Sequence, residues 1–431
     1  MAQVKDSASN GNGATEKQTF GDVRQLAAPL GLKEYWYPAL EDKKVKKKPV
    51  GLKLLGEDLV FFRGKDGQVK SLWNVCPHRG GSLMHGDCHF EGTVSCPYHG
   101  WTFDGDGNVL AVLPEGPESK IPGKVVARKY PTVTLKGMVF VWMGEGEAVA
   151  PEEDIPPEMF DDRTMILYDT EYWQANWQVA LENGLDAHVP YVHRNAMRSM
   201  MFPVPTWGPV GVRNKVVNNK LVTAVSGPTT SITGVRPKNP FAQEYFPGLD
   251  AKWPKHQWRI PLAWLLTPMR IRNTKRARWE SPEEWQTGHH LPSMFRADHR
   301  TDMYTRTSVP VTEALSRQIY FKAVRPNSWV GRWYERIHFK VYGRWMQVSD
   351  FSKQDVGAMV QQRYDTPEFL SSTDSHQVVW RRLILRARGM MAAEEAKQVA
   401  ITPAEVASYQ RQEEFGLEAD HADKLIEQEA G

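Results

Sequence analysis

The chain has 431 residues, which is enough for two domains or for one large domain with an appended module. Its 41% hydrophobic and 24% charged residues and its net charge of +3 are ordinary for a globular protein, and they argue neither for nor against nucleic-acid binding. No apolar run reaches the ~18 residues of a membrane-spanning helix, and three cysteines cannot form a disulfide framework, so we expect metal binding in a reducing cytoplasm.

The N-terminal part of the chain predicts a tail, a helix and then a β domain. Residues 1–19 have no apolar core and are not Arg-rich, which predicts a disordered tail and not a signal or transit peptide. Residues 20–32 have helical spacing that Pro29 and Gly31 end. From about residue 36 to 148, short β-like runs alternate with Gly-rich turns, which predicts a small antiparallel β domain.

A lysine run, "KKVKKK", occupies residues 43–48 of this region. A solvated loop or the guard of an edge strand is the favoured interpretation. A docking patch for an acidic electron donor is the alternative.

The second half of the chain mixes strands and helices. An acidic stretch with Pro and Gly breaks, residues 144–159, predicts a linker, and "NWQVALENGLDAHVPYVH" from residue 176 begins as a helix. Residues 203–345 contain short strand-like runs and Pro-rich loops. Helical spacing then returns in two segments, followed by an acidic C-terminal tail: 349–364, 375–400 and 401–431.

All three cysteines lie between residues 76 and 103, in "CPHRGGSLMHGDCHFEGTVSCPYHGWTF". Each of two arms supplies one Cys and one His, as Cys76-x-His78 and Cys96-x2-His99. A Cys2His2 zinc site takes all four ligands on one ion and usually pairs Cys with Cys. A Rieske [2Fe–2S] cluster takes two Cys on one iron and two His on the other, so the mixed arms favour it.

The glycines and prolines around the arms carry a family resemblance. "CPHRGG" and "CPYHGW", within residues 76–101, resemble the Rieske domain of the Rieske non-haem iron oxygenases. The preceding "EYWYPAL…LKLLGEDLVFFR" resembles the single-subunit, carbazole dioxygenase-like type of terminal oxygenase. The resemblance implies that the two Cys and two His bind the cluster. Between the arms, His85, Cys88 and His89 are interpreted as loop residues, with Cys88 a free thiol.

A second constellation lies about a hundred residues downstream. His188 and His193 form a His-x4-His pair, which is weak on its own because random histidines often produce it. The surrounding "NW…EN…D…H…H" is similar to the iron-binding helix of the same family, whose mononuclear Fe(II) takes two His and one carboxylate. The resemblance implies that both histidines are iron ligands. It also makes Asp186 and Asn183 candidate catalytic residues, with Asp186 bonded to a Rieske histidine across a subunit boundary and Asn183 close to the iron.

One spacing departs from the family pattern. The family usually has D-x-x-H, whereas Asp186 and His188 form D-x-H, which puts the bridging role of Asp186 in question more than the histidines. The third iron ligand is expected on a later helix, where "SKQDVGAMVQQ" matches the family pattern at Asp355. Asp350 and Asp365 are the nearby alternatives, since Asp is also a common helix N-cap.

The resemblance implies an α+β fold, in which a small antiparallel β Rieske domain accompanies a helix-grip-like catalytic domain with an antiparallel sheet and helices. The expected boundaries are 36–148 for the Rieske domain, and 20–35 with 149–400 for the catalytic mononuclear iron domain. The implied cofactors are a [2Fe–2S] Rieske cluster and a mononuclear Fe(II). The implied partners are a ferredoxin or reductase, O2, and two further copies in a head-to-tail homotrimer. Neither nucleic acid nor a membrane is expected as a partner, and the expected location is cytoplasmic.

The implied reaction is hydroxylation of a small apolar, aromatic molecule by ring dihydroxylation, monohydroxylation or oxidative demethylation. The pocket is expected from residues 200–320, where "MRSMMFPVPTW" and "PLAWLLTPM" supply apolar surface. Two alternatives stay open: a Rieske-type electron-transfer protein with a non-catalytic second domain, and a zinc-stabilised binding protein.

Overall fold

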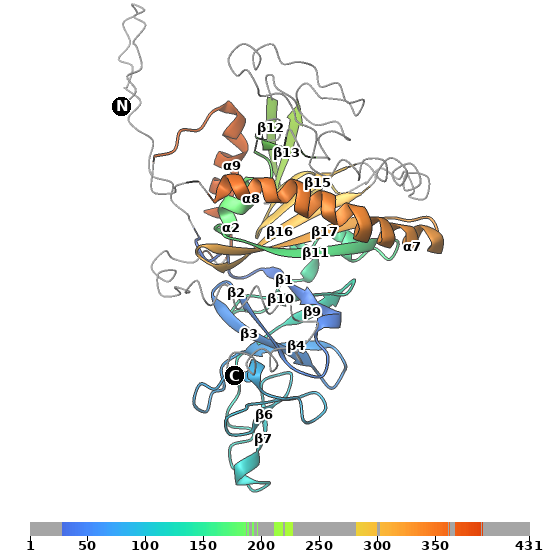
Figure 1. Cartoon of the computed structure of the whole chain (residues 1–431). Coiled ribbons are helices and arrows are strands. Elements are labelled where there is room, and N and C mark those ends of the chain that lie inside the picture. The colour runs from blue at the N-terminus through green and yellow to red at the C-terminus, as the bar shows by residue number, and fades with distance from the viewer. Residues whose placement is uncertain are drawn as a thin grey trace, which may run out of the picture.

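The computed structural model describes residues 28–186, 188, 192–193, 196, 211–218, 220–226, 282–299, 302–360, 362, 367–388 and 390. An all-β part and a part in which helices cover a large sheet stack end to end (Figure 1). Among these residues, no helix is long and apolar enough to cross a membrane. The predictions for residues 1–19 and 401–431, and for the apolar segments around residues 197–207 and 261–269, lie outside the described residues.

The all-β part consists of three antiparallel sheets, as the alternation of β-like runs and turns predicted. The strand orders are β1-β10-β9, β2-β3-β4-β8 and β5-β6-β7. The strands are β1 (Trp36–Glu41), β2 (Val50–Leu54), β3 (Glu57–Arg63), β4 (Val69–Trp73), β5 (Val94–Ser95), β6 (Trp101–Phe103), β7 (Val109–Val112), β8 (Lys129–Tyr130), β9 (Thr132–Leu135) and β10 (Met138–Trp142). The lysine run lies between β1 and β2, where Val45 is buried and residues 46–48 are exposed, as a solvated loop requires.

The second part is built on one seven-stranded antiparallel sheet with the order β11-β17-β16-β15-β14-β13-β12. Its strands are β11 (Met165–Trp173), β12 (Gly211–Val217), β13 (Lys220–Ser226), β14 (Gly288–His290), β15 (Met294–Asp298), β16 (Met303–Thr312) and β17 (Leu315–Val324). β16 is buried along its whole length, and β17 nearly so, because helices cover one face of the sheet and the β domain packs against the other. A large antiparallel sheet with helices confirms the predicted α+β class.

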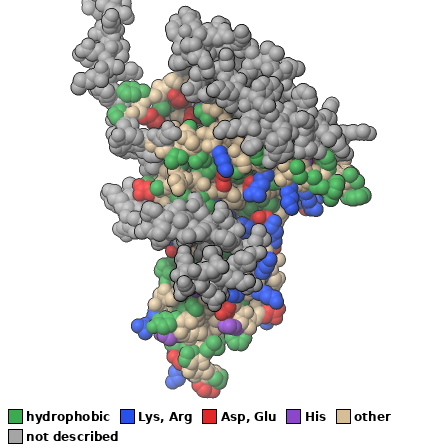
Figure 2. Space-filling view, viewed as in Figure 1, with side chains coloured by type: hydrophobic (Ala, Val, Ile, Leu, Met, Phe, Trp, Pro, Cys, Tyr) green, Lys and Arg blue, Asp and Glu red, His purple; other side chains and the backbone are tan. Residues whose placement is uncertain are grey.

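A long helical segment crosses the sheet (Figure 1). It runs through α7 (Trp329–His338), two π-helical stretches at Phe339–Gly343 and Trp345–Ser352, and α8 (Lys353–Met359). The expectation of strands and loops through residue 345 is therefore wrong from residue 329. The N-terminal end of α7 projects beyond the sheet, where hydrophobic side chains gather at the surface (Figure 2) and Trp329 is 79% exposed.

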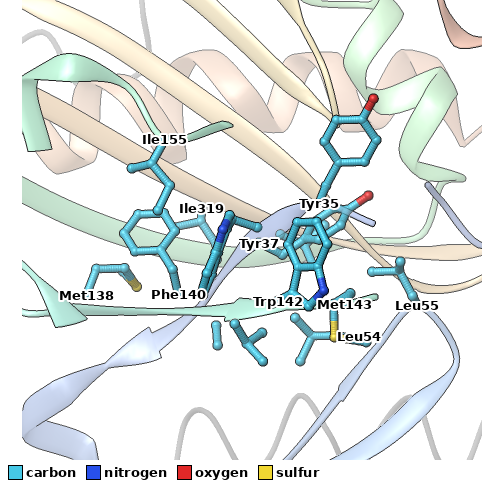
Figure 3. Packing of buried hydrophobic residues seen from close by; sticks show 14 of the residues in the cluster. Tyr35, Tyr37, Leu54, Leu55, Met138, Phe140, Trp142, Met143, Ile155 and Ile319 are labelled. Carbon is cyan, nitrogen blue, oxygen red and sulfur yellow. The ribbon is translucent and has the colours of Figure 1, made fainter. Parts of the chain in front are cut away.

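The two parts share a hydrophobic core. Figure 3 shows Tyr35, Tyr37, Phe140 and Trp142 of the β domain packed toward Ile319 of the large sheet, all of them buried. A shared core of this kind holds domains in one orientation, because separating them would expose apolar surface to water.

The predicted linker is part of this junction and not a free connection. It contains α1 (Pro151–Asp154) and a 3₁₀ turn at Pro157–Met159, and it buries Asp154 and Glu158. Glu158 forms a buried ion pair with Arg296 of β15, with Nη1–Oε1 at 2.7 Å. The Pro and acidic residues that predicted a linker also start short helices and supply buried ion-pair partners.

The last helix among the described residues, α9 (Ser375–Ile384), confirms the start of the helix expected over residues 375–400. It ends at Ile384, earlier than expected, and residues 385–388 form a turn. α9 packs against β12 and β13 of the large sheet, with Trp380 fully buried.

Candidate metal centres

The two Cys–His arms share one backbone design. The N–H of Cys76 donates to the carbonyl of Gly81 (2.8 Å), and the N–H of Gly80 donates back to the carbonyl of Cys76 (2.9 Å). The arm around Cys96 has the same two hydrogen bonds, at 2.8 and 3.0 Å. Gly80 and Gly100 occupy equivalent places with φ of 73° and 63°, a conformation that favours glycine. Two equivalent loops therefore present their side chains to a common centre.

The side chains of the arms separate into sulfur and imidazole pairs. Cys76 and Cys96 are buried, while His78 is exposed and His99 is half-buried. The two imidazole rings lie 4.6 Å apart between centroids, and His78 stacks on Trp101 at 4.7 Å with an interplanar angle of 3°. Buried thiols and outward imidazoles fit the Rieske donor set, in which the cysteine-bound iron is interior and the histidine-bound iron faces the surface.

The two loops pack so closely around the cysteine sulfurs that an added side-chain carbon would not fit. A Cβ added to Gly81 would lie 2.9 Å from Cys96 Sγ. Burial, together with the neighbouring Cys96 thiol, raises the pKa of Cys76 to about 11.

The other candidates in this stretch do not join the centre. His85 and His89 are exposed, and His89 Nε2 lies 3.8 Å from Asp87 Oδ2. Cys88 is half-buried against the hydrophobic cluster of this domain, and burial raises the pKa of its thiol to about 11. This arrangement agrees with the interpretation of all three as loop residues.

The second centre begins at α2 (Trp177–Glu182), whose residues are all buried. The side chain of Asn176 caps the helix by accepting from the N–H of Gln178 (2.9 Å). Its amide also donates to the carbonyls of Pro29 and Glu313, so the start of α2 is tied to two distant segments. α2 therefore delivers the residues that follow it to a fixed place.

The structure brings the three predicted iron ligands together. His188 Nε2 and His193 Nε2 lie 3.0 and 2.7 Å from Asp355 Oδ1, and 3.3 Å from each other. Of the His, Cys, Asp and Glu residues that the structure describes, these are the ones that place three candidate ligand atoms within 4.8 Å of one another. Asp350 is not part of this group, and Asp365 lies outside the described residues.

Polar contacts around the triad favour metal binding. Burial disfavours the charged form of Asp355, but hydrogen bonds from His188 and His193 outweigh it and hold the pKa of Asp355 well below its usual range. Asn183 Nδ2 donates a long hydrogen bond to Asp355 Oδ1 (3.4 Å). His193 Nδ1 lies 3.2 Å from Gln354 Oε1, which fixes the tautomer that leaves Nε2 free to bind.

One side of the triad is closed by packing. The ring of Phe351 stacks on His193 at 3.6 Å, and His193 is fully buried. The His188 side chain is 18% exposed. Solvent therefore reaches the triad at His188 and not at His193.

Asp186 lies near the triad but is held from another direction. Its Oδ2 is 3.9 Å from His188 Nδ1, while its Oδ1 accepts a hydrogen bond from Gln377 Nε2 of α9 (2.6 Å). The sequence did not single out Gln377, Gln354 or Phe351. Gln354 and Phe351 could have been found from their spacing to Asp355, whereas no local pattern links Gln377 to Asp186.

Two family models match the chain. The Rieske [2Fe-2S] domain matches residues 35–131, and the homotrimeric ring hydroxylase family matches residues 142–390. The chain belongs to the homotrimeric ring hydroxylase family. The matches cover the two parts of the fold separately, and each contains one of the two candidate centres.

Relatives of this chain include terminal oxygenases. The terminal oxygenase component of carbazole 1,9a-dioxygenase from Metapseudomonas resinovorans is 34% identical over 183 residues, which cover 42% of this chain and 47% of the relative. The oxygenase subunit of phthalate 4,5-dioxygenase from Pseudomonas putida is 34% identical over 173 residues, covering 38% of this chain and 39% of the relative. The chain thus spans about half or less of the length of these relatives.

A solved structure supports the fold over most of the chain. The terminal oxygenase of carbazole 1,9a-dioxygenase from Nocardioides aromaticivorans has a TM-score of 0.64 and 25% identity, covering 85% of this chain and 97% of the other. The alignment includes both parts of the molecule, so the pairing of the β domain with the large sheet is a property of the family fold.

Proposed function

We propose that the chain is a terminal oxygenase that uses O2 and electrons from a ferredoxin or reductase to hydroxylate a small apolar, aromatic molecule. The observation that carries this proposal is the group of His188, His193 and Asp355, with ligand atoms within 4.8 Å of one another and with His193 and Asp355 buried. Two His and one carboxylate with an open side are the donor set of non-haem Fe(II) oxygenases. The names of the relatives, oxygenases of carbazole and phthalate, support an aromatic substrate.

The chain's own residues hold and orient this centre. His188 and His193 would hold a mononuclear Fe(II) through Nε2 and Asp355 through Oδ1, and the ion would supply the O2 chemistry there. Gln354 accepts from His193 Nδ1 and keeps that ring in its binding tautomer. Asn183, with its amide toward Asp355 Oδ1, steadies the carboxylate beside the reacting atoms.

The Rieske arms of the same chain do not serve this centre directly. β6, which follows the second arm, lies at the end of the molecule opposite to α2 and α8 (Figure 1). A head-to-tail homotrimer would bring one chain's outward His78 and His99 to the next chain's Asp186, and such closed heterologous contacts generate a ring. The family description as homotrimeric supports this arrangement.

The finer properties follow from the same proposal. Ring dihydroxylation, monohydroxylation and oxidative demethylation all fit the donor set, since substrate placement decides among them. The Rieske domain would span residues 36–148, with 20–35 and 149–400 forming the catalytic domain. A cytoplasmic location is supported by three cysteines that form no disulfide framework.

The iron content of a ligand variant tests the proposal. Asp355→Ala should lose mononuclear iron, so that total iron falls by about one third, while the Rieske visible absorption and sulfide content stay unchanged. Substrate-stimulated O2 uptake should fall to background. The matched control is Asp162→Asn, because Asp162 is fully exposed on the surface and pairs only loosely with Lys136 (3.5 Å).

The two alternative functions give different results. An electron-transfer protein with a silent second domain would keep its full activity in Asp355→Ala and would contain no third iron. A zinc-stabilised binding protein would be colourless and would contain no sulfide. Either result would overturn the proposed oxygenase.

A further inference from the structure

α9 contacts the segment that leads into the mononuclear centre at two points. Gln377 Nε2 donates to Asp186 Oδ1 (2.6 Å), and Arg381 makes a bidentate pair with Glu182, with Nε–Oε1 at 2.9 Å and Nη2–Oε2 at 2.8 Å. Gln377 and Arg381 are four residues apart and lie on one face of α9. Glu182 and Asp186 are also four residues apart, so the two pairs match in spacing.

The position of Asp186 is not fixed by helix α2. α2 ends at Glu182, so the helical register does not set the direction of the Asp186 side chain. The distance from Asp186 Oδ2 to His188 Nδ1 is 3.9 Å, which is beyond hydrogen-bond range. His188 Nδ1 is buried without a hydrogen-bond partner, and such a nitrogen is costly to leave unsatisfied.

The two histidines of the triad therefore differ in how they are supported. His193 Nδ1 has Gln354 Oε1 at 3.2 Å on the element that carries Asp355. His188 has the carboxylate of Asp186 facing its Nδ1, and α9 holds that carboxylate. A carboxylate within hydrogen-bond distance of that nitrogen orients a metal-binding histidine and raises its basicity. Asp186 Oδ2, at 3.9 Å, is the group placed to supply such a contact.

We propose that Gln377 is a positioning residue for the mononuclear centre. By binding Oδ1 of Asp186, it keeps Oδ2 directed at His188 Nδ1. α9 thus orients the Asp186 carboxylate toward His188, which the short spacing between the two residues does not do. Arg381 fixes the distance between α9 and α2 through Glu182, so the Gln377 amide meets Asp186 at a set place. This inference rests on the proposed function, because His188 acts as a ligand only if the triad binds a metal.

The test measures metal affinity and not turnover. The mononuclear site is stripped with a chelator while the Rieske absorption is monitored, and Co(II) is titrated in with its visible absorption as the signal. Gln377→Met keeps the side-chain length but removes the N–H donor, and it should weaken Co(II) binding by about 10–100-fold. The matched control is Arg382→Ala, since Arg382 is exposed on the same helix and should bind Co(II) like the wild type.

A double variant separates positioning from general damage to α9. Asp186→Asn should weaken Co(II) binding to a similar degree, and the Asp186→Asn, Gln377→Met double variant should be no weaker than either single variant. The inference is overturned if Gln377→Met binds Co(II) within about twofold of the wild type, or if the two losses add. His188→Ala distinguishes this failure from that of the proposed function: if it binds Co(II) as tightly as the wild type, the triad itself is not a metal site.

Discussion

The ion pair between Glu158 and Arg296 holds the connecting segment on the seven-stranded sheet, and breaking it should lower the free energy of unfolding. The two side chains are 3% and 0% exposed, and the pair is bidentate, with Nη1–Oε1 at 2.7 Å and Nη2–Oε2 at 3.1 Å. Nε also donates to the carbonyl of Trp285 (3.0 Å), and Nη1 also donates to Thr305 Oγ1 (3.1 Å). Without Glu158, Nη1 and Nη2 would each lose a charged acceptor.

Glu158→Ala leaves a charged guanidinium buried without its counter-charge. Breaking a buried pair from one side typically lowers the free energy of unfolding by about 3–5 kcal/mol. Replacing both partners, as Glu158→Leu with Arg296→Met, removes the uncompensated charge and should recover at least half of that loss. Glu152→Ala, on the exposed side of α1, is the control and should change the free energy of unfolding by less than about 0.5 kcal/mol.

The assay is urea unfolding followed by tryptophan fluorescence, with the midpoint compared between variants at a constant slope. The reasoning fails if Glu158→Ala costs under about 1 kcal/mol, as an exposed pair would. It also fails if the double variant is at least as unstable as Glu158→Ala, because the loss would then come from packing and not from the stranded charge.

Two further predictions concern the domain junction and the Rieske arms. Burial raises the pKa of Asp154 to about 6 from its ordinary 3.8, despite the nearby Arg388, so the folded state binds a proton more tightly than the unfolded chain does. The contribution of Asp154 to stability should therefore fall as pH rises from about 4 to about 6 and level off above. Asp154→Asn should accordingly gain about 2–3 kcal/mol relative to the wild type between pH 4 and pH 7 in the same urea assay; an unchanged difference contradicts this. Gly81→Ala places a Cβ 2.9 Å from Cys96 Sγ and should lower the sulfide content and Rieske absorption per chain. Gly357→Ala, where an added Cβ meets nothing within 4 Å, should leave both unchanged, and a full cluster in Gly81→Ala would refute the packing argument.

The Rieske arms could be predicted from sequence because their determinants are local. Each arm is a short loop whose Cys, His and Gly fall within six residues, and the structure gives both loops the same pair of backbone hydrogen bonds. Ligand order then separated a mixed two-iron donor set from a zinc site. The all-β character of this region was equally accessible, since its strands alternate with turns whose glycines have positive φ, as Gly67 and Gly107 do.

The segments that were predicted wrongly depend on partners far away in the chain. Residues 329–345 form a helix that buries Tyr334 and His338 and leaves Trp329 and Trp333 exposed. Aromatic and β-branched residues there favour strands locally, but packing across the sheet overrides that preference. The sequence predicted a linker at residues 144–159 but not its buried ion pairs, because the partners of its buried acids, Arg296 and Arg388, lie more than a hundred residues away.

At the mononuclear site, helical spacing in the sequence does not identify the third ligand. The two π-helical stretches before α8 contain more residues per turn than an α-helix. Each extra residue rotates the side chains that follow it by roughly 100° about the helix axis. Periodicity alone therefore could not choose between Asp350 and Asp355, and only the family pattern did so.

The short Asp186–His188 spacing put the bridging role of Asp186 in question, because a prediction from spacing assumes that the helix sets the direction of each side chain. In the structure, Gln377 of α9 orients the Asp186 carboxylate instead, through a hydrogen bond from its Nε2 to Asp186 Oδ1 (2.6 Å). A change of one residue in spacing can then be absorbed without moving the histidines, since the carboxylate is held from outside the helix. If that is the physical basis of the departure, the identity of residue 377 should matter to metal binding as much as the identity of residue 186.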